Sequence, residues 1–283
     1  MFKFILPIIF IFLFAPFVHA ATIVATPSST VLQGDPILLD LRTNSTVRSA
    51  TWHDETVPAF AYQGTQHVLL GADLRLAPGT YSFRATLSDR TTLAQDITVA
   101  NREMYKAPLG IPEKLGGNTT SSAQKLVSTL AAENASLVGL RTFARALWSK
   151  PFRVPLNTDI VVTDPYGYSR QTVDQTITHK GTDFRAEIGT RVRAMNRGIV
   201  RLVRTYRNYG KTIVVDHGLG VQTLYMHLSK INVNVGELVE RGQVIGLSGQ
   251  TGYAESPHLH VSVRINEVSI DPVKFLALFG TNI

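Results

Sequence analysis

Residues 258–265 of this 283-residue chain read His-Leu-His-Val-Ser-Val-Arg-Ile, the last of several short strands that the sequence predicts after Phe152. The other predicted strands span residues 191–204, 212–216, 222–227 and 243–247. Glycines recur between these segments, and closely spaced glycines favour tight turns over helices. We therefore expect an antiparallel β-sheet in the C-terminal half. The imidazoles of His258 and His260 should point to the same side of the last strand, because side-chain direction repeats every two residues.

A second β region is predicted upstream, over residues 22–100. Residues 37–41 are apolar, and residues 81–87 alternate between polar and apolar side chains, as a half-buried strand should. Turn signals separate the strands at residues 34–36 (Gly-Asp-Pro) and 77–79 (Ala-Pro-Gly). Short strands and turns at this spacing predict an immunoglobulin-like sandwich.

A linker with a helix is expected over residues 101–150. Prolines and glycines interrupt any periodicity in its first part. A helix should then run from about Ser121 to Leu137, with Ser121 or Ser122 as its cap. A second short helical piece is predicted over residues 143–148.

The N-terminus, residues 1–20, reads as a secretory signal. Lys3 provides a positive charge, residues 4–17 are apolar, and the segment ends in Val18-His19-Ala20, where a signal peptidase would cut. We expect cleavage after Ala20 and no stable membrane span afterwards. The apolar run is shorter than the roughly 20 residues that a transmembrane helix needs. An uncleaved membrane anchor is the alternative.

Cysteine content and charge restrict the environment and the partners. The chain has no cysteine, which excludes disulfides and cysteine-bound zinc. Its formal net charge of +7 favours an anionic partner such as wall polymer, acidic lipid or nucleic acid. The basic run of residues 185–211 could retain the protein on an anionic wall, although a solvated strand face is the simpler interpretation. Export would separate the protein from ATP, so hydrolysis without a cosubstrate is the natural chemistry.

Three separated motifs point to metal chemistry. They are residues 179–183 (His-Lys-Gly-Thr-Asp), residues 225–228 (Tyr-Met-His-Leu) and His258-Leu-His260. Each alone has an ordinary explanation, as a surface ion pair or a packing histidine. Together they supply three metal-ligand side chains and two further imidazoles, enough to hold one zinc ion and to run hydrolysis on it. Three protein ligands leave a position for water, whose pKa the ion lowers towards about 7.

Residues 151–275 resemble the M23 peptidase domain of lysostaphin-type zinc endopeptidases. The matching phrases occur in family order and are His179-Lys-Gly-Thr-Asp183-Phe184, Gly189-Thr-Arg-Val192, Val214-Val-Asp-His217-Gly218, Thr223-Leu-Tyr-Met-His227-Leu228, Gly242-Gln-Val-Ile-Gly246, and Thr251-Gly252 followed by Pro257-His-Leu-His260. The resemblance implies that His179, Asp183 and His260 bind one zinc ion per chain. It also implies that His227 and His258 are the catalytic histidines, orienting water and stabilising the tetrahedral intermediate.

The resemblance further implies a mainly β protein in which an antiparallel M23 peptidase domain, residues 151–283, carries a long groove over the metal. It implies an exported zinc endopeptidase that cleaves peptide bonds in the cross-bridges or stem peptides of bacterial peptidoglycan. Such a protein would remodel the cell wall, in the periplasm or outside the cell. We expect peptidoglycan rather than nucleic acid as the partner, a monomer, and independent folding of a fragment that starts near Lys150.

Two other functions are compatible with parts of the sequence. A non-catalytic relative could regulate another hydrolase or bind the wall, but such relatives generally lose ligands. A phosphocarrier of related β-architecture could use paired histidines, but the signal segment disfavours it because phosphate donors are cytosolic.

The chain departs from the family pattern at two places. Residues 254–257 (Ala-Glu-Ser-Pro) replace a loop that often reads Ser-Thr-Gly-Pro, and Val261-Ser262 replaces an aromatic residue and a glutamate. Neither change is expected to touch a ligand or a catalytic histidine. Glu255 adds negative charge near the groove and bears on the choice of substrate. His217 matches a position that is usually not a ligand, and we interpret it as structural.

Overall fold

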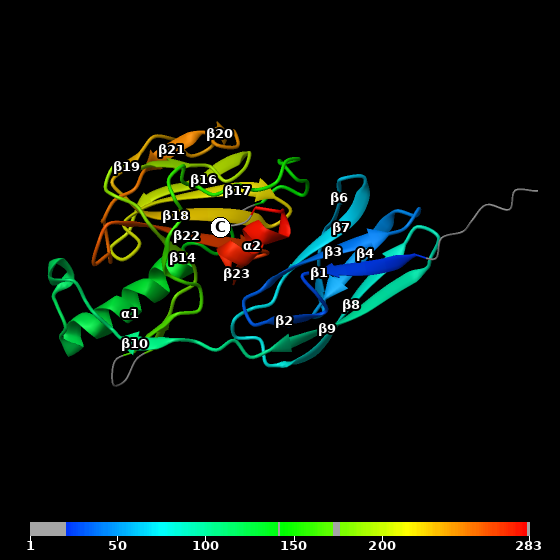
Figure 1. Cartoon of the computed structure of the whole chain (residues 1–283), viewed down its shortest axis with the longest axis horizontal. Helices are drawn as coiled ribbons and strands as arrows, with labels where there is room; N and C mark the ends of the chain where they lie inside the picture. The colour runs from blue at the N-terminus through cyan, green and yellow to red at the C-terminus, as the bar shows by residue number, and fades with distance from the viewer. Residues whose placement is uncertain (1–20, 141, 172–175, 282–283) are drawn as a thin grey trace, which may run out of the picture.

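The computed structural model describes residues 21–140, 142–171 and 176–281, which form two β regions joined by a segment with one long helix (Figure 1). The predicted signal, residues 1–20, lies outside the described residues. Within the described part of the chain, no helix has the length and apolar character needed to cross a membrane. The mainly β class predicted from the sequence is confirmed.

The N-terminal region is a sandwich of two sheets. The first is ordered β1-β3-β7-β6, with β1 (Thr22–Thr26), β3 (Pro36–Arg42), β7 (Thr65–Gly71) and β6 (Ala59–Tyr62). The second is ordered β2-β9-β8-β4-β5, with β2 (Thr30–Leu32), β9 (Thr92–Ala100), β8 (Gly79–Leu87), β4 (Val47–Trp52) and β5 (Glu55–Thr56). This order corresponds to strands A-B-E-D packed against A′-G-F-C-C′, as in immunoglobulin-like domains. The predicted sandwich is therefore confirmed.

Two further contacts are typical of this sandwich. Near the start of β8, the Tyr81 hydroxyl donates a hydrogen bond to the Ala77 carbonyl at 2.7 Å, which forms a tyrosine corner. Trp52 on β4 is buried in the core between the sheets. The predicted strands at residues 37–41 and 81–87 fall inside β3 and β8, whose inward side chains, such as Leu39 and Phe83, are fully buried.

The segment between the β regions contains β10 (Lys106–Pro108), a 3-10 turn η1 (Glu113–Leu115) and helix α1 (Thr120–Ala135). The helix is confirmed, but its predicted cap is wrong. Thr119 is the cap, because its hydroxyl accepts the Ser122 amide at 3.1 Å. The helix buries Ala123 and Leu126 against the preceding linker.

The short helical piece predicted over residues 143–148 is absent. The backbone there bonds to the turn between two strands of the C-terminal sheet. The Phe143 carbonyl accepts the Leu219 amide at 2.7 Å, and the Leu147 amide donates to the His217 carbonyl at 2.9 Å. Carbonyl and amide groups used in this way are not free for a helical turn.

The C-terminal region is built on an antiparallel sheet, as predicted. Its order is β11-β14-β22-β18-β17-β16-β20, with β11 (Val162–Asp164), β14 (Thr182–Arg185), β22 (His258–Ile265), β18 (Val221–Leu228), β17 (Lys211–Gly218), β16 (Gly198–Thr205) and β20 (Leu238–Val239); β23 (Val268–Ile270) also pairs with β22. A smaller sheet contains β15 (Arg191–Arg193), β21 (Val244–Leu247) and β19 (Lys230–Ile231). The strand predicted over residues 191–204 is thus divided between β15 and β16, which belong to different sheets.

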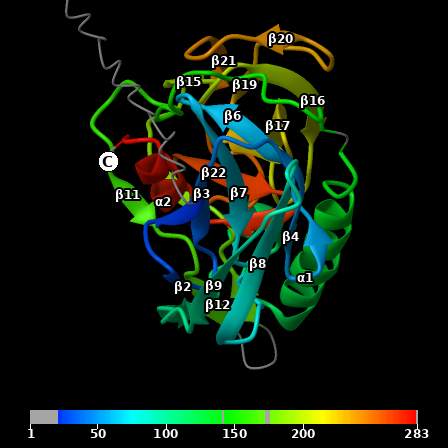
Figure 2. The same ribbon diagram turned by 90° about the vertical axis from the view of Figure 1, so that its right-hand side faces the viewer.

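Two peripheral elements complete this region. β12 (Ser169–Gln171) pairs with β13 (Thr176–Thr178) and, in parallel, with β10, which ties the linker to the C-terminal region. Helix α2 (Pro272–Leu278) is capped by the Asp271 carboxylate, which accepts the amides of Val273 and Lys274. Figure 2 shows the sandwich in front of the C-terminal sheet, with α1 along one flank.

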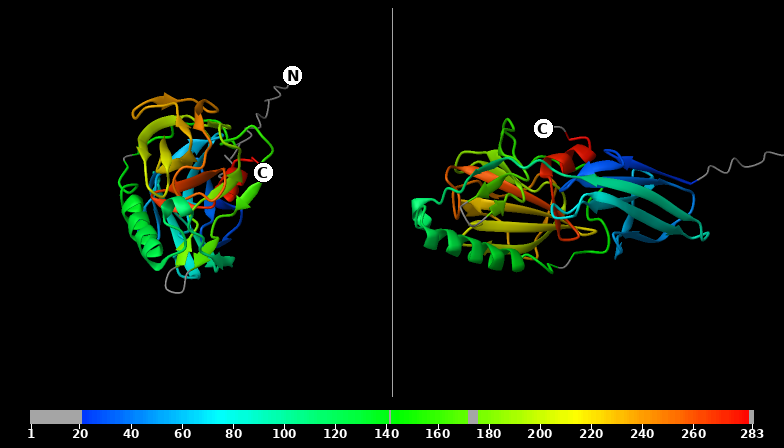
Figure 3. Two further views of the ribbon diagram at one scale, coloured as in Figure 1. Left: turned by 90° about the vertical axis from the view of Figure 1, so that its left-hand side faces the viewer. Right: turned by 90° about the horizontal axis from the view of Figure 1, so that it is seen from below.

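Besides its own core, the sandwich contributes Leu38, Tyr62 and Leu69 to the apolar core of the C-terminal region. Trp148, which follows the linker, packs with ring-centroid distances of 5.5 Å to Tyr62 of β6 and 5.3 Å to Phe279 beyond α2. Beside this cluster, the buried Asp35 carboxylate binds Arg102 at 2.6 Å and Lys274 at 2.8 Å. These contacts join the sandwich end to end with the C-terminal region (Figure 3).

Candidate metal centre

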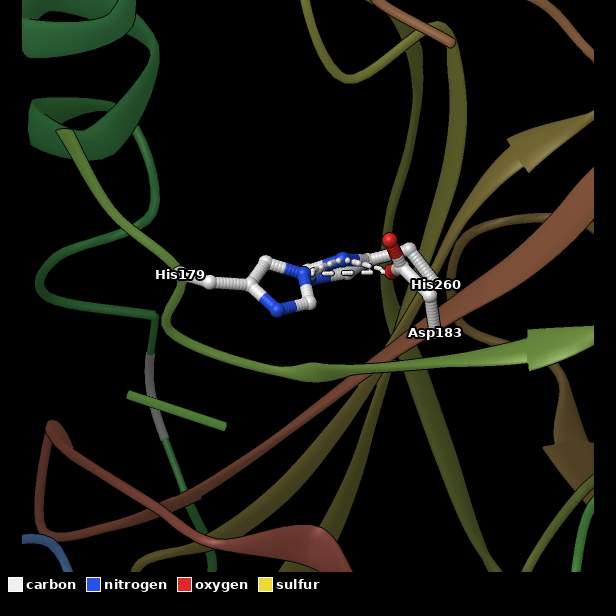
Figure 4. A group of neighbouring side chains, drawn as sticks. All are labelled: His179, Asp183 and His260. Carbon is white, nitrogen blue, oxygen red and sulfur yellow. Dashed lines mark hydrogen bonds and ion pairs between the residues drawn. The ribbon is translucent and has the colours of Figure 1, made fainter. Parts of the chain in front are cut away.

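The three predicted metal ligands meet at one point on the C-terminal sheet. Asp183 on β14 is directly paired with His260 on β22, and His179 lies just before β14. Asp183 Oδ1 lies 2.8 Å from His260 Nδ1 and 3.1 Å from His179 Nε2, and the two nitrogens are 2.9 Å apart (Figure 4). A side chain at Gly181 would clash with the His260 ring and the Val261 carbonyl, so glycine permits this close approach.

This arrangement fits a zinc ion. Tetrahedral zinc bonds of about 2.0–2.2 Å place neighbouring ligand atoms roughly 3.3–3.5 Å apart, so the triangle need only widen by a few tenths of an ångström. Two imidazole nitrogens and one carboxylate oxygen are donors that zinc accepts readily. The three side chains form a potential metal-binding group, with ligand atoms all within 4.8 Å of one another.

Neighbouring acceptors fix which ring nitrogen of each ligand faces the metal position. The Pro165 carbonyl lies 3.1 Å from His179 Nδ1 and can only accept, so this nitrogen carries the proton and Nε2 keeps its lone pair. The Ser262 hydroxyl donates to the Lys180 carbonyl at 2.8 Å and therefore accepts from His260 Nε2 at 2.9 Å. His260 Nδ1 is then free to bind a metal.

Ser262 is a functional residue that the sequence analysis misjudged. The change to Val261-Ser262 was expected to touch neither a ligand nor a catalytic histidine, and this expectation is wrong because Ser262 contacts His260 directly. Side chains two residues apart on a strand lie on the same face, so strand periodicity could have identified the contact.

The two remaining predicted histidines, His227 and His258, lie beside the metal group. Their ring centroids are 4.8 Å apart, and His258 Nε2 is 3.6 Å from Asp183 Oδ2. His227 Nδ1 donates to the Thr251 carbonyl at 2.8 Å, and His258 Nδ1 donates to the Ser256 carbonyl at 2.8 Å. In the neutral form of each ring, the lone pair therefore lies on Nε2. The structure thus brings all five predicted side chains together.

A break in strand alternation places His227 in the site. Tyr225 of β18 faces the core and Met226, paired with His260, faces the metal group. Strict alternation would direct His227 back into the core, but its φ of 60° lies in the left-handed region. For a residue with a side chain this conformation costs about 1–2 kcal/mol. The His227 amide bonds to the Tyr209 carbonyl at 3.0 Å, which helps to hold the turn.

Burial and the charges of neighbouring side chains shift the pKa values of the residues in the site. Burial opposes the charged form of Asp183, but His179 and His260 outweigh it and hold the pKa of Asp183 well below its usual range. Burial, together with the neighbouring His258 and His260, lowers the pKa of His227 to about 3. The pKa of His260 is lowered mainly by burial. Burial opposes the charged form of His179, but the charge and the hydrogen bond of Asp183 outweigh it and raise the pKa of His179. Metal binding requires an unprotonated donor nitrogen, so a proton competes with the metal at His179.

His217 lies apart from this group, as predicted. Its ring bonds to the Arg197 carbonyl and to the Thr223 hydroxyl, both at 2.8 Å, and it is fully buried. Burial, which outweighs the hydrogen bond to Arg197 and the charge of Asp216, lowers the pKa of His217 to about 4.

A cleft of about 810 Å³ lies over the metal group. Helix α1 contributes Leu130 and Ala131 to one wall, and the opposite part includes Arg170 and Glu255. Arg170 binds Glu255 at 3.1 Å and Asp164 at 2.7 Å. The negative charge that Glu255 was expected to add near the groove is therefore paired with a guanidinium.

The fold and the site together define a class of protein. An antiparallel sheet carries three metal-ligand side chains and two free imidazoles at the floor of a cleft, which is the donor set of a metallohydrolase.

Comparisons with known proteins relate the C-terminal region to one family. Residues 177–272 match the model of peptidase family M23. The chain is 43% identical over 96 residues to the peptidoglycan DD-endopeptidase ShyA of Vibrio cholerae serotype O1, which is 34% of this chain and 22% of that protein. It is 42% identical over 110 residues to lysostaphin of Staphylococcus staphylolyticus, which is 36% of this chain and 22% of that protein. The chain thus spans under a quarter of the length of these relatives.

One solved structure resembles both β regions. A Pseudomonas aeruginosa chain assigned to peptidase family M23 superposes with a TM-score of 0.57 at 26% identity, over 87% of this chain and 94% of that chain. The similarity to peptidase family M23 thus covers residues 177–272, in the C-terminal region that carries the metal group.

Proposed function

We propose that the protein is an exported zinc-dependent endopeptidase that hydrolyses peptide bonds in bacterial peptidoglycan. The observation that carries the proposal is the set of five side chains with fixed ring tautomers: His179, Asp183 and His260 as ligands, and His227 and His258 with free Nε2 atoms. The relatives named for peptidoglycan cleavage support the substrate class. Location in the periplasm or outside the cell, association with the wall and a monomeric state belong to the same proposal.

His179 Nε2, Asp183 Oδ1 and His260 Nδ1 would hold one zinc ion. A bound zinc ion polarises a peptide carbonyl and lowers the pKa of a coordinated water molecule. The protein contributes a rigid ligand triangle, since each donor atom is set by a hydrogen bond or by strand pairing. The cleft above the triangle leaves room for an extended peptide.

The two other histidines would handle protons. His258 is partly exposed to the cleft, and its Nε2 can accept a proton from the attacking water. The Asp183 carboxylate at 3.6 Å stabilises the resulting positive charge. His227 is buried and its Nδ1 proton is committed to Thr251, so its Nε2 orients water as a hydrogen-bond acceptor.

We also propose a division of the chain into a sandwich at residues 22–100, a linker at residues 101–150 and the peptidase domain at residues 151–283. The close fit of β10 and α1 to the C-terminal sheet supports a linker that works together with the peptidase domain.

Zinc content and peptidoglycan hydrolysis test the proposal together. The wild-type protein should bind one zinc ion and release peptides from purified peptidoglycan. His260→Ala should lose zinc and activity, whereas His258→Ala should keep zinc and lose turnover. His53→Ala, at an exposed position in the sandwich, is the matched control and should change neither. A stoichiometric zinc protein that hydrolyses no peptidoglycan from several sources would instead support a non-catalytic relative.

A further inference from the structure

The floor of the cleft continues past the metal group along β22. Side chains on β22 point alternately to the cleft and to the core. The cleft side carries His258, His260, Ser262 and Arg264, and the core side carries Leu259, Val261, Val263 and Ile265. Arg264 lines the same cleft as the metal ligands. Four residues of strand separate it from His260, which corresponds to about 13 Å.

Arg264 is a buried cation. Only 7% of the residue is exposed. One terminal nitrogen donates to the Leu137 carbonyl at 2.9 Å, but Nε has no hydrogen-bond partner among the described residues. Burial lowers the pKa of Arg264, although the nearby Tyr209 and Glu267 oppose this shift. A guanidinium nevertheless remains charged in proteins, so its positive charge faces the cleft without full compensation.

Arg264 forms no ion pair with another of the described residues. The Arg and Lys residues that form ion pairs are Arg42, Arg75, Arg102, Arg170, Arg197, Arg201 and Lys274. Neither Arg264 nor the exposed Lys180 has a carboxylate within the 4.0 Å of an ion pair in this part of the chain. Buried charges in proteins are normally paired, and an unpaired one is costly.

A second cavity of about 240 Å³ adjoins this end of the cleft. It shares Lys180 and Arg264 with the larger cleft and adds Arg75 from the sandwich. The two carboxylates at its wall are already occupied. Asp73 binds Arg75 through two hydrogen bonds of 3.1 Å, and Glu267 accepts the Gly139 amide at 2.7 Å. Three cationic side chains and two carboxylates therefore line this cavity, which leaves a net positive charge where the two cavities meet.

We propose that Arg264, with Lys180 beside it, binds a carboxylate group of the substrate peptide. An extended peptide rises about 3.3–3.6 Å per residue, so this carboxylate would lie about four residues from the bond over the metal group. A carboxylate in the cleft can accept from the terminal nitrogen that does not bond to Leu137, and charge-assisted hydrogen bonds of this kind are strong. The proposal rests on the proposed peptidase function, because it assigns a subsite of that same cleft.

Binding of matched peptides tests this subsite. The ligands are cross-linked muropeptides released by a muramidase, either with free carboxyl groups or with the same groups chemically amidated. Binding is measured by calorimetry on zinc-loaded protein in a His258→Ala background, so that the peptide is not consumed. The free-carboxyl ligand should bind about 10- to 100-fold more tightly than its amide, the range expected for one charged hydrogen-bonded pair.

Variants assign the preference to specific residues. Arg264→Gln should bind the two ligands equally, Arg264→Lys should retain part of the preference, and Lys180→Gln should reduce it. Arg204→Gln, at an exposed arginine outside both cavities, removes the same charge and should keep the full preference. Zinc content and urea unfolding identify any variant that fails to fold, in which case Lys180→Gln provides the decisive comparison.

The outcomes separate the subsite from the peptidase function. Equal binding of both ligands by the parent protein would overturn the subsite even if wild-type protein hydrolyses peptidoglycan. A full preference in folded Arg264→Gln, or in Lys180→Gln where Arg264→Gln does not fold, would do the same. A carboxylate preference lost in these variants supports the subsite even if no hydrolysis is found. Inorganic phosphate should compete weakly. Displacement of the muropeptide by phosphate at equal concentration would overturn a peptide carboxylate as the ligand.

Discussion

His260 reaches the metal position through Nδ1 because its other ring nitrogen is bonded to Ser262, whose own proton goes to the Lys180 carbonyl. Ser262→Ala removes the acceptor that fixes the tautomer. We expect zinc affinity to fall about 10- to 100-fold, as is typical when the hydrogen-bond partner of a ligand histidine is lost. Competition with a chromophoric chelator measures the change. Ser262→Thr keeps the hydroxyl and should retain affinity, and Ser128→Ala on α1 is the control. Unchanged affinity in Ser262→Ala would contradict this role.

His217 makes stability depend on pH. Its pKa is about 4 in the folded protein, lowered by burial, against about 6.5 for an unperturbed histidine. Between these values the unfolded chain binds the proton more readily, so the contribution to stability is complete above pH 6.5 and is lost as the pH falls towards 4. From pH 7 to pH 5 the loss from this residue should be about 2 kcal/mol.

Urea unfolding of metal-free protein at the two pH values checks this expectation. His217→Gln cannot take up the proton, so its unfolding free energy should fall by about 2 kcal/mol less than that of the wild type. His53→Gln, at an exposed position, should show the wild-type pH dependence. Identical pH dependence of His217→Gln and wild type would refute the assignment.

The sequence predicted all five side chains of the site. Sequence motifs and the two-residue period of strands both depend on the spacing of nearby residues, which the sequence shows directly. The orientation of His227 could not be predicted in this way. Its left-handed backbone, held by the bond to Tyr209, reverses the alternation that the sequence suggests. The contact of Ser262 with His260 was open to prediction and was missed.

Among the elements, α1 is attached to the loop between β16 and β17 by several hydrogen bonds, and the buried carboxylate of Glu133 accepts the backbone amides of that loop. Glu133 accepts the Asn208 amide at 2.9 Å and the Tyr209 amide at 3.2 Å, and the Tyr209 carbonyl in turn accepts the His227 amide at 3.0 Å. Glu133→Ala leaves two backbone amides without acceptors, which should lower the unfolding free energy by about 2–4 kcal/mol. Zinc should be retained, while turnover should decrease because the support of His227 is loosened.

Urea unfolding, zinc analysis and peptidoglycan hydrolysis together measure these effects. Glu103→Ala, at an exposed linker position, is the control. Loss of zinc in Glu133→Ala, or full activity with wild-type stability, would count against this attachment.

The sequence predicted which segments form strands and which form the helix, but it did not predict where these elements end. The alternating segments became β3 and β8, and α1 formed where apolar residues recur at helical spacing. Its cap moved to Thr119, since several hydroxyl residues in succession offer equivalent caps. The segment at residues 143–148 is irregular because its backbone bonds to a turn that is distant in the sequence, and no local pattern predicts such a partner.

At the scale of the whole molecule, the C-terminal region depends on the linker. A fragment that starts near Lys150 should fold, but it lacks Glu133 and also Leu137, which is buried beside Tyr206. A fragment that starts at Asn101 keeps both. We expect the longer fragment to unfold at a distinctly higher urea concentration and to bind one zinc ion. Equal unfolding midpoints for the two fragments would contradict a stabilising role for the linker.

The shared core of the two β regions was not foreseen. The contact joins three distant parts of the chain through Trp148, Tyr62 and Phe279. Nothing in the sequence around each residue distinguishes it from other apolar residues. Sequence patterns distinguish buried from exposed faces, but they do not specify which buried faces meet across a domain boundary.

The acceptors that hold the ring nitrogens have a consequence for how the protein matures. They are backbone carbonyls and a serine hydroxyl, none of which changes its ionisation near neutral pH. The tautomers of the ligand rings therefore do not depend on a bound ion, and under the proposed function the chain would fold first and acquire zinc later. Loading then follows mass action, and free zinc at 100 times Kd adds about 2.7 kcal/mol to the stability of a protein that has already folded.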